Sequence, residues 1–312
     1  MRVITLKAYA KINLSLEVLR RRPDGYHDIL SRMQDISLHD VVTLSLPASG
    51  GESDGCFIEG IPVEFSIDDA TLPRGRDNLA IRGAEALLGR LPETAARPAR
   101  IRIAVEKKLP VAAGIAGGSG NAAGVMLGLN ALLGYPLSLR ELMAAGAKVG
   151  ADVPFSLMLN ARKNEALLAG LPGLAEASVS AWMTEIGDVA TPAEPIRCAV
   201  ILMNPGIPVS TREVYEAIDA LQDREICEEL YYNIMERYTL ARYPEVAALK
   251  REMQAHLHAE HIVMSGSGPT IAAYYPDRQT AAEEYEAARR AEWLRPGWRM
   301  WLTESGGDTS WS

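Results

Sequence analysis

Cysteine, long apolar runs and clustered basic residues are all scarce in this sequence, and each scarcity excludes a class of protein. The three cysteines, Cys56, Cys198 and Cys227, lie far apart and lack the spacing of metal ligands, so we expect neither a disulfide scaffold nor a zinc site. No apolar run approaches the ~20 residues of a membrane span. The first seven residues also lack the apolar core of a signal peptide. We therefore expect a cytoplasmic protein with reduced thiols and no membrane partner.

The charge balance argues against a nucleic-acid partner. The formal net charge is -8 over 312 residues, and the nearest approach to a basic run is Arg20-Arg21-Arg22, beside a turn. A nucleic-acid surface normally needs a basic patch. An anionic small molecule is still compatible with this charge, because a few lysines and backbone amides can bind phosphate inside an acidic protein.

Strand patterns come first in the chain. Residues 11–18 alternate apolar and polar side chains, which is the period of a half-buried strand, and Lys11 and Asn13 share its polar face. Pro23-Asp24-Gly25 is a turn signal. Further strand-like stretches follow at residues 29–36 and 41–46.

A strand, a glycine-rich loop and a helix follow in the middle of the chain. Residues 101–105 alternate like a strand, and apolar residues between 122 and 133 recur at helical spacing. Ser138 and Glu141 form a capping box that opens another helix. We expect that helix to end near Gly150, which places Asp152 at a helix-to-loop transition.

The second half of the chain mixes strands and helices as well, so the predicted class is α+β. Strand-like runs lie at 199–203, 262–264, 270–275 and 298–302, and helix signals begin at Ser210, Pro244 and Gln279. Residues 160–195 follow no clear pattern. We place a domain boundary near residue 160, which gives domains at 1–160 and 161–303 and a tail at 304–312.

The glycine-rich run from Leu109 to Ala123 is the strongest local signal for chemistry. Its glycines let the backbone approach a ligand closely, and a helix start presents N–H groups that attract phosphate. The run lacks the Gly-Lys-Ser/Thr ending of a P-loop and the spacing of a dinucleotide fingerprint. From the residues alone, a flexible turn explains these glycines about as well as an anion site.

Other residues have two readings each. Lys11 is either a solvated lysine or a cation that stabilises a transferring phosphoryl group. Asp152 is either a helix cap or surface residue, or a base for a hydroxyl. The Tyr26-His27 pair is either a turn-packing tyrosine with a surface histidine or an aromatic element that stacks on a flat base.

Taken together, the motifs resemble one family. They are Ala10–Leu14, Pro23–His27, Pro110–Ala123, Gly150–Pro154 and Ser265–Thr270, and in this order they resemble the motifs of the 4-diphosphocytidyl-2-C-methyl-D-erythritol kinases, a family of the GHMP kinase superfamily. The resemblance covers most of residues 5–303. The Asp-Gly-Tyr-His element points to this family rather than to homoserine, mevalonate or galactose kinases.

The resemblance implies a fold and a set of ligands. It implies a ribosomal-protein-like N-terminal α/β sandwich and a ferredoxin-like C-terminal domain, with the substrate in the cleft between them. ATP would arrive with Mg²⁺ and bind the glycine-rich loop at Pro110, Gly114, Ala116, Gly117, Gly118, Ser119, Gly120 and Asn121. The acceptor would be a small molecule that carries a cytidine diphosphate group.

The same resemblance assigns the catalytic and recognition roles. Asp152 would take the proton of the substrate's 2-hydroxyl, and Lys11 would polarise that hydroxyl and help hold Asp152 ionised. Tyr26 and His27 would recognise the cytosine, with Asn13 nearby. The magnesium ligands, and the choice between monomer and homodimer, stay open.

Departures from the family pattern keep two alternatives open. Ala116 replaces a glycine of the loop and tolerates positive φ poorly, so we expect the loop to take a different path. Gly120 replaces a serine whose hydroxyl could bind phosphate or magnesium. Residues 160–173 lack the family's usual turn. The alternatives are a GHMP kinase of another small alcohol and a catalytically weak GHMP-fold binding protein.

Overall fold

The computed structural model describes residues 2–47, 56–111, 113–221 and 226–307. These residues form two compact units, each built from separate stretches of chain. The first comprises Met1–Ala10, Leu38–Val111 and Ala116–Val179, and the second Lys11–Ser37, Ala112–Ile115 and Ser180–Ser312. Of the sequence predictions, Ala112 in the glycine-rich run and residues 308–312 of the tail lie outside the described residues. The contiguous boundary near residue 160 stays a prediction.

Two long strands contribute to both units. They are β1 (Arg2–Arg21) and β2 (His27–Leu46), which pair with each other. In the first unit, residues 41–45 of β2 pair antiparallel with β5 (Ile101–Glu106), and β5 pairs parallel with β4 (Ile61–Ile67). A short β3 (Phe57–Ile58) closes that side of the sheet.

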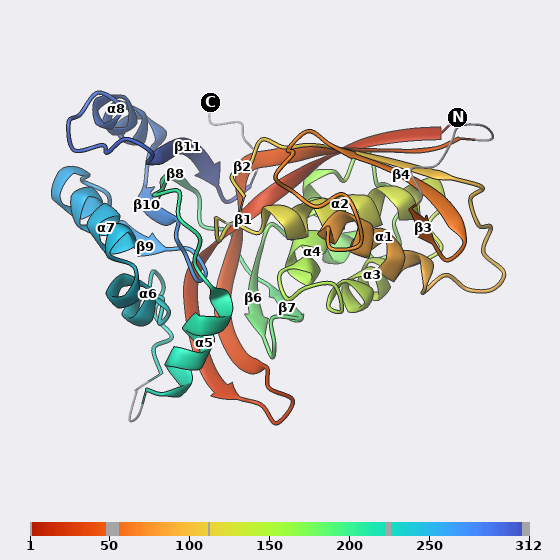
Figure 1. Ribbon diagram of the computed structural model, residues 1–312, viewed down its shortest axis with the longest axis horizontal. Coiled ribbons are helices and arrows are strands. Elements are labelled where there is room, and N and C mark those ends of the chain that lie inside the picture. Colours follow the sequence, from red (N-terminus) through yellow and green to blue (C-terminus); the bar gives the residue numbers. More distant parts are fainter. Residues whose placement is uncertain (1, 48–55, 112, 222–225, 308–312) are drawn as a thin grey trace. The chain divides into compact units, whose positions relative to one another are not determined.

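Helices cover one side of this sheet (Figure 1). They are α1 (Leu79–Leu88), α2 (Gly117–Leu132), α3 (Leu139–Gly146) and α4 (Val153–Lys163), with a short 3-10 turn at Leu174–Glu176. The residues of β5 alternate between buried and more exposed, as expected for a strand with one face on a core. Its buried side chains join those of the four helices in one apolar cluster.

Asn160 of α4 and Asn164, the residue that caps its C-terminus, cover the backbone of β1 in the first unit. Tyr9 N–H donates to Asn160 Oδ1 (2.7 Å), and Lys7 N–H donates to Asn164 Oδ1 (3.2 Å). Asn164 Nδ2 donates back to the Lys7 carbonyl at 3.0 Å. Because Asn160 and Asn164 are one helical turn apart, both amides face the strand and take the place of a neighbouring strand.

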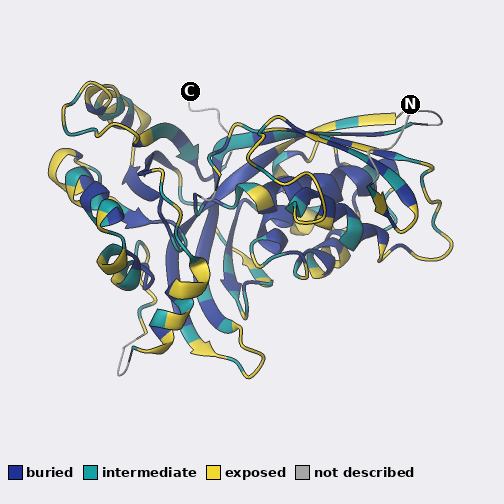
Figure 2. Ribbon diagram, viewed as in Figure 1, coloured by how far each residue is buried: buried dark blue, intermediate teal, exposed yellow. Residues whose placement is uncertain are grey.

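The second unit contains a four-stranded antiparallel sheet. Its order is β11 (Arg299–Ser305), β8 (Cys198–Asn204), β10 (Ile271–Tyr275) and β9 (His261–Met264). Strands β8 and β10 are buried along their whole length (Figure 2). Their apolar core includes side chains of α5 (Thr211–Asp219), α6 (Glu236–Arg242), α7 (Pro244–His256) and α8 (Arg278–Ala288).

A second group of strands in this unit extends the β1–β2 hairpin. Residues 31–34 of β2 pair antiparallel with β6 (Ser180–Thr184), and β6 pairs with β7 (Val189–Pro192). The mixture of strands and helices in both units confirms the predicted α+β class.

Local predictions succeeded where a cap or a turn marks the element. Ser138 with Glu141 forms the predicted capping box of α3. Three predictions were wrong in detail. The stretches 29–36 and 41–46 are one strand, α3 ends at Gly146 rather than near Gly150, and Asp152 precedes the unpredicted helix α4 instead of a loop.

Candidate active site

Lys11 and Asn13 lie side by side on β1, as their spacing predicts. Lys11 Nζ donates to Asn13 Oδ1 at 2.7 Å, and Asn13 Nδ2 donates to Ser31 Oγ at 2.8 Å. Ser31 Oγ in turn donates to the Ser15 carbonyl. The expectation of a half-buried strand was wrong here, because Lys11 is only 3% exposed and Asn13 only 2%. A lysine buried this far needs polar partners, which excludes the solvated reading.

The loop of residues 265–270, between β9 and β10, reaches the same strand. Ser265 Oγ lies 3.4 Å from Asn13 N and donates to the Gly114 carbonyl at 3.0 Å. Gly114 has φ +71°, and a Cβ there would lie 2.5 Å from the Ser265 carbonyl oxygen, so only glycine fits this position. The structure thus joins three of the sequence motifs, around Lys11, Gly114 and Ser265, within the second unit.

The remaining loop residues form the start of α2, in the first unit. Ala116 is the N-cap residue, and Gly117, Gly118, Ser119, Gly120 and Asn121 lie in the first turns of the helix rather than in the predicted loop. Ala116 adopts the left-handed conformation, with φ 58° and ψ 33°. The predicted change of path is therefore not required, because alanine takes the strained conformation that glycine would take freely, at a cost of about 1–2 kcal/mol.

The start of α2 has the properties of an anion site. The first N–H groups of a helix have no partners in the helix itself and carry partial positive charge, and the first turn of α2 contains no acidic residue. Ser119 and Asn121 are buried, and Asn121 Oδ1 has no hydrogen-bond partner within the described residues. A Cβ on Gly120 would lie 3.0 Å from the Tyr9 carbonyl. The side chain of a serine at this position would therefore press against the backbone of β1.

A buried ion pair supports the segment that leads into this helix. Asp40 on β2 pairs with Lys107, and both side chains are buried. Asp40 Oδ1 also accepts from the backbone N–H groups of Lys108 (2.7 Å) and Leu109 (2.9 Å). The carboxylate therefore holds the chain just before Pro110, a role that no local pattern in the sequence indicates.

Asp152 occupies the N-cap position of α4, with Pro154 in the first turn of the helix. Its φ of -82° and ψ of -9° are helical, whereas capping residues usually have extended backbones. In the described part of the chain, its carboxylate accepts no capping hydrogen bond from α4. The helix-cap reading therefore does not account for this aspartate.

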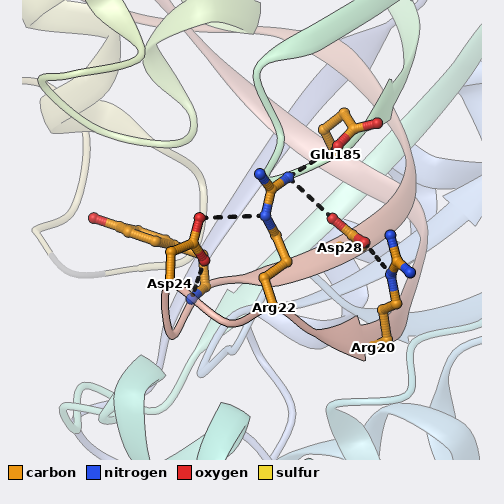
Figure 3. Close-up of polar contacts among 6 residues, drawn as sticks. Arg20, Arg22, Asp24, Asp28 and Glu185 are labelled. Carbon is orange, nitrogen blue, oxygen red and sulfur yellow. Dashed lines mark hydrogen bonds and ion pairs between the residues drawn. The ribbon is translucent and has the colours of Figure 1, made fainter.

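The turn that carries Tyr26 is held by a charged network in the second unit (Figure 3). Arg22 Nη1 reaches Asp28 Oδ1 (3.2 Å) and Glu185 Oε2 (2.9 Å), and Arg22 Nε lies 3.3 Å from Asp24 Oδ2. The hydrogen bond from Arg20 is the main cause that lowers the pKa of the Asp28 carboxyl.

Hydrogen bonds within the same turn fix the backbone of Tyr26, while its ring is exposed to solvent. Asp24 Oδ1 accepts from the Tyr26 N–H at 3.0 Å, and the Tyr26 carbonyl accepts from Arg22 N at 2.7 Å. The Tyr26 residue is nevertheless 62% exposed, so its ring does not pack at the turn. An aromatic ring held this way presents a face for stacking.

His27 contacts α5 through its ring. Its Nε2 lies 2.7 Å from Asp219 Oδ1, and its ring stacks on Tyr215 with centroids 4.7 Å apart. Sequence reasoning missed both partners, because they lie about 190 residues away and carry no local signal. His27 is thus an anchored side chain rather than a surface histidine.

Comparison with known proteins identifies the family. The model of the GHMP kinases N terminal domain matches residues 78–159, and that of the GHMP kinases C terminal domain matches residues 215–293. A protein of Syntrophotalea carbinolica named 4-diphosphocytidyl-2-C-methyl-D-erythritol kinase is 36% identical, across 96% of this chain and 98% of its own length. This chain belongs to that kinase family.

Further relatives agree with this assignment to the 4-diphosphocytidyl-2-C-methyl-D-erythritol kinases. A protein of the same name from Geobacter sulfurreducens is 36% identical over 94% of this chain and 98% of its own. A crystal structure of 4-(cytidine 5'-diphospho)-2C-methyl-D-erythritol kinase matches with a TM-score of 0.72 at 28% identity, covering 98% of this chain and 100% of that one. A homoserine kinase from Cytophaga hutchinsonii shares the fold, with a TM-score of 0.61 at 17% identity, covering 97% and 95% of the two chains.

Two features are absent from the described residues. No helix among them is both long and apolar enough to cross a membrane. No group of three or more histidine, cysteine or acidic side chains in those ranges could hold a metal ion.

Proposed function

We propose that this chain transfers the γ-phosphoryl group of ATP to the 2-hydroxyl of 4-(cytidine 5'-diphospho)-2-C-methyl-D-erythritol, a step in isoprenoid precursor biosynthesis. The observation that carries this proposal is the similarity to kinases named for that substrate over nearly the full length of both chains. A superfamily kinase of another small alcohol, homoserine kinase, shares only its fold with this chain.

Asp152 and Lys11 would carry out the chemistry. Asp152 takes the proton of the 2-hydroxyl, the hydroxyl oxygen attacks the γ-phosphorus, and the bond to the ADP oxygen breaks. Lys11 polarises the hydroxyl and stabilises the negative charge of the transition state. Its hydrogen bond to Asn13 holds Nζ in one position, which suits a reaction that depends on positioning and charge stabilisation.

ATP would bind along the loop that begins at Pro110. Gly114 and Ala116 shape the loop, while Gly117, Gly118 and Gly120 keep the helix start open to the phosphates. The buried oxygens of Ser119 and Asn121 suit Mg²⁺, a hard cation that prefers oxygen ligands. When bound with ATP, the ion would neutralise phosphate charge.

The cytidine group would be recognised by the β1–β2 turn. The exposed ring of Tyr26 offers a stacking face, and the polar atoms of His27 and Asn13 would hydrogen-bond the cytidine group. The three cysteines are free thiols, which suits a cytoplasmic enzyme.

Product analysis tests this proposal. The purified protein would be incubated with ATP, Mg²⁺ and the cytidine substrate, and the product examined by ³¹P NMR for a new phosphate on the 2-hydroxyl. Homoserine, mevalonate and galactose serve as alternative acceptors. Phosphorylation of one of these in place of the cytidine substrate would indicate another GHMP kinase. Binding of ATP and substrate without transfer would indicate a binding protein.

A further inference from the structure

Asp219 makes a specific contact with the recognition turn. One of its oxygens, Oδ1, lies 2.7 Å from His27 Nε2, and the other, Oδ2, lies 3.5 Å from Arg21 Nη1. The His27 side chain is 9% exposed and that of Asp219 23% exposed. The imidazole side of the contact is therefore shielded from water, which strengthens a charge-assisted hydrogen bond, while Asp219 itself lies at the surface.

The position of Asp219 in its helix is locally unfavourable. It is the last residue of α5, where the helix dipole disfavours negative charge. A residue that breaks a local preference often serves a tertiary contact. Here that contact is with Arg21 and His27, on the strand that leads into the turn and the strand that leaves it.

The His27 ring is held by a stacking contact on its face as well as by the Asp219 contact at its edge. It stacks on Tyr215 with an interplanar angle of 20°. Stacking fixes the ring plane, and the Asp219 contact fixes which nitrogen points toward α5. The other nitrogen, Nδ1, makes no hydrogen bond to any residue in the described ranges, so it is available to a ligand.

The carboxylate also determines where the ring proton resides. An ionised carboxylate only accepts hydrogen bonds, so the nitrogen that faces it must carry the proton. In the neutral imidazole, Nδ1 is then an acceptor. Cytosine presents an amino donor at the ring position where uracil presents a carbonyl acceptor, so an acceptor at Nδ1 pairs with cytosine and repels uracil.

We propose that Asp219 is a positioning residue that fixes the His27 tautomer and thereby makes the enzyme select cytidine over uridine substrates. The proposal rests on the proposed function, because it concerns the recognition of the same substrate. One wrongly paired base edge is worth roughly a ten- to hundredfold loss, which sets the size of the expected effect.

Selectivity of Asp219→Asn tests this directly. An asparagine amide either accepts from Nε2–H or donates to Nε2, so both tautomers become possible. We expect the ratio of kcat/KM for the cytidine substrate to that for its uridine analogue to fall about tenfold or more. The kcat for the cytidine substrate should change little, because the reacting groups are untouched.

Glu216→Gln is the matched control. It makes the same change of charge on the same helix, at an exposed carboxylate that pairs with Arg212, and should leave the ratio unchanged. A thermal midpoint for each variant verifies folding. Equal ratios in the wild type and Asp219→Asn would overturn the inference while leaving the kinase assignment in place. A wild type that does not use the cytidine substrate would overturn both.

NMR of the wild type gives a second readout that does not depend on turnover. Long-range ¹H–¹⁵N spectra at a pH where His27 is neutral distinguish the protonated ring nitrogen from the other. We expect the proton on Nε2 in the wild type and in Glu216→Gln, and a mixture of tautomers in Asp219→Asn. A proton on Nδ1 in the wild type would contradict the proposal.

Discussion

The ion pair between Asp40 and Lys107 should be the most costly polar contact to break in the first unit. Asp40 is fully buried, and only 7% of the Lys107 side chain is exposed. Asp40→Ala would leave a buried ammonium group and the N–H groups of Lys108 and Leu109 without their acceptor. Removing one partner of a buried pair typically costs about 3–5 kcal/mol, a large part of the ~5–15 kcal/mol that stabilises a typical domain.

Two further variants divide this loss into its parts. Asp40→Asn keeps an oxygen for the two backbone N–H groups and removes only the charge, so it should cost less than Asp40→Ala. Combining Asp40→Leu with Lys107→Met removes both charges, and this double variant should recover part of the stability that Asp40→Ala loses.

The assay is thermal and urea unfolding of the four proteins. At roughly 2–4 °C per kcal/mol, Asp40→Ala should lower the midpoint by about 6–20 °C. Since Asp40 holds the chain before Pro110, the KM for ATP should also rise in this variant. A shift of less than about 2 °C, or a double variant less stable than Asp40→Ala, would show that the pair is not the support inferred here.

Three other predictions concern the asparagine that bonds to β1, the loop before α2 and the turn between β1 and β2. Asn160→Leu should cost about 1–3 kcal/mol in unfolding free energy, because the Tyr9 N–H loses its acceptor; a loss under about 0.5 kcal/mol would contradict this. Ala116→Gly should be neutral or stabilising by up to about 1 kcal/mol, whereas Ala116→Val should destabilise, since a β-branched residue resists positive φ; the reverse order in urea unfolding would refute the strain. Tyr26→Ala should weaken calorimetric binding of the cytidine substrate more than that of ATP, and equal losses would argue against stacking.

The sequence predicted the elements whose signals are local. The turn at residues 23–25 and the capping box at Ser138 depend on neighbours a few residues away. Helix α4 was missed although a signal was present, because Pro154 is as typical of a first helical turn as of a loop. A Val-Pro sequence after Asp152 is compatible with the end of a helix and with the beginning of one, and the structure has the second.

Contacts between distant residues could not be predicted in this way. The alternation of residues 11–18 correctly predicted that Lys11 and Asn13 share one face of the strand. It did not predict that this face is buried, because the burial depends on Ser31 and Ser265. Asp40, Asn160 and Asp219 each bond to a residue far along the chain, and no period or spacing relates the two. Such partners become visible only once the strands and helices have been placed.

Substrate-dependent release of ADP distinguishes a kinase of the cytidine substrate from the alternatives. The wild type and Asp152→Asn would be assayed with ATP and Mg²⁺, with and without the cytidine substrate, and calorimetry would measure substrate binding to both. We expect substrate-dependent ADP release by the wild type, and its loss in Asp152→Asn with substrate binding retained. Wild-type turnover by Asp152→Asn, or ADP release by the wild type that does not depend on the cytidine substrate, would contradict the account.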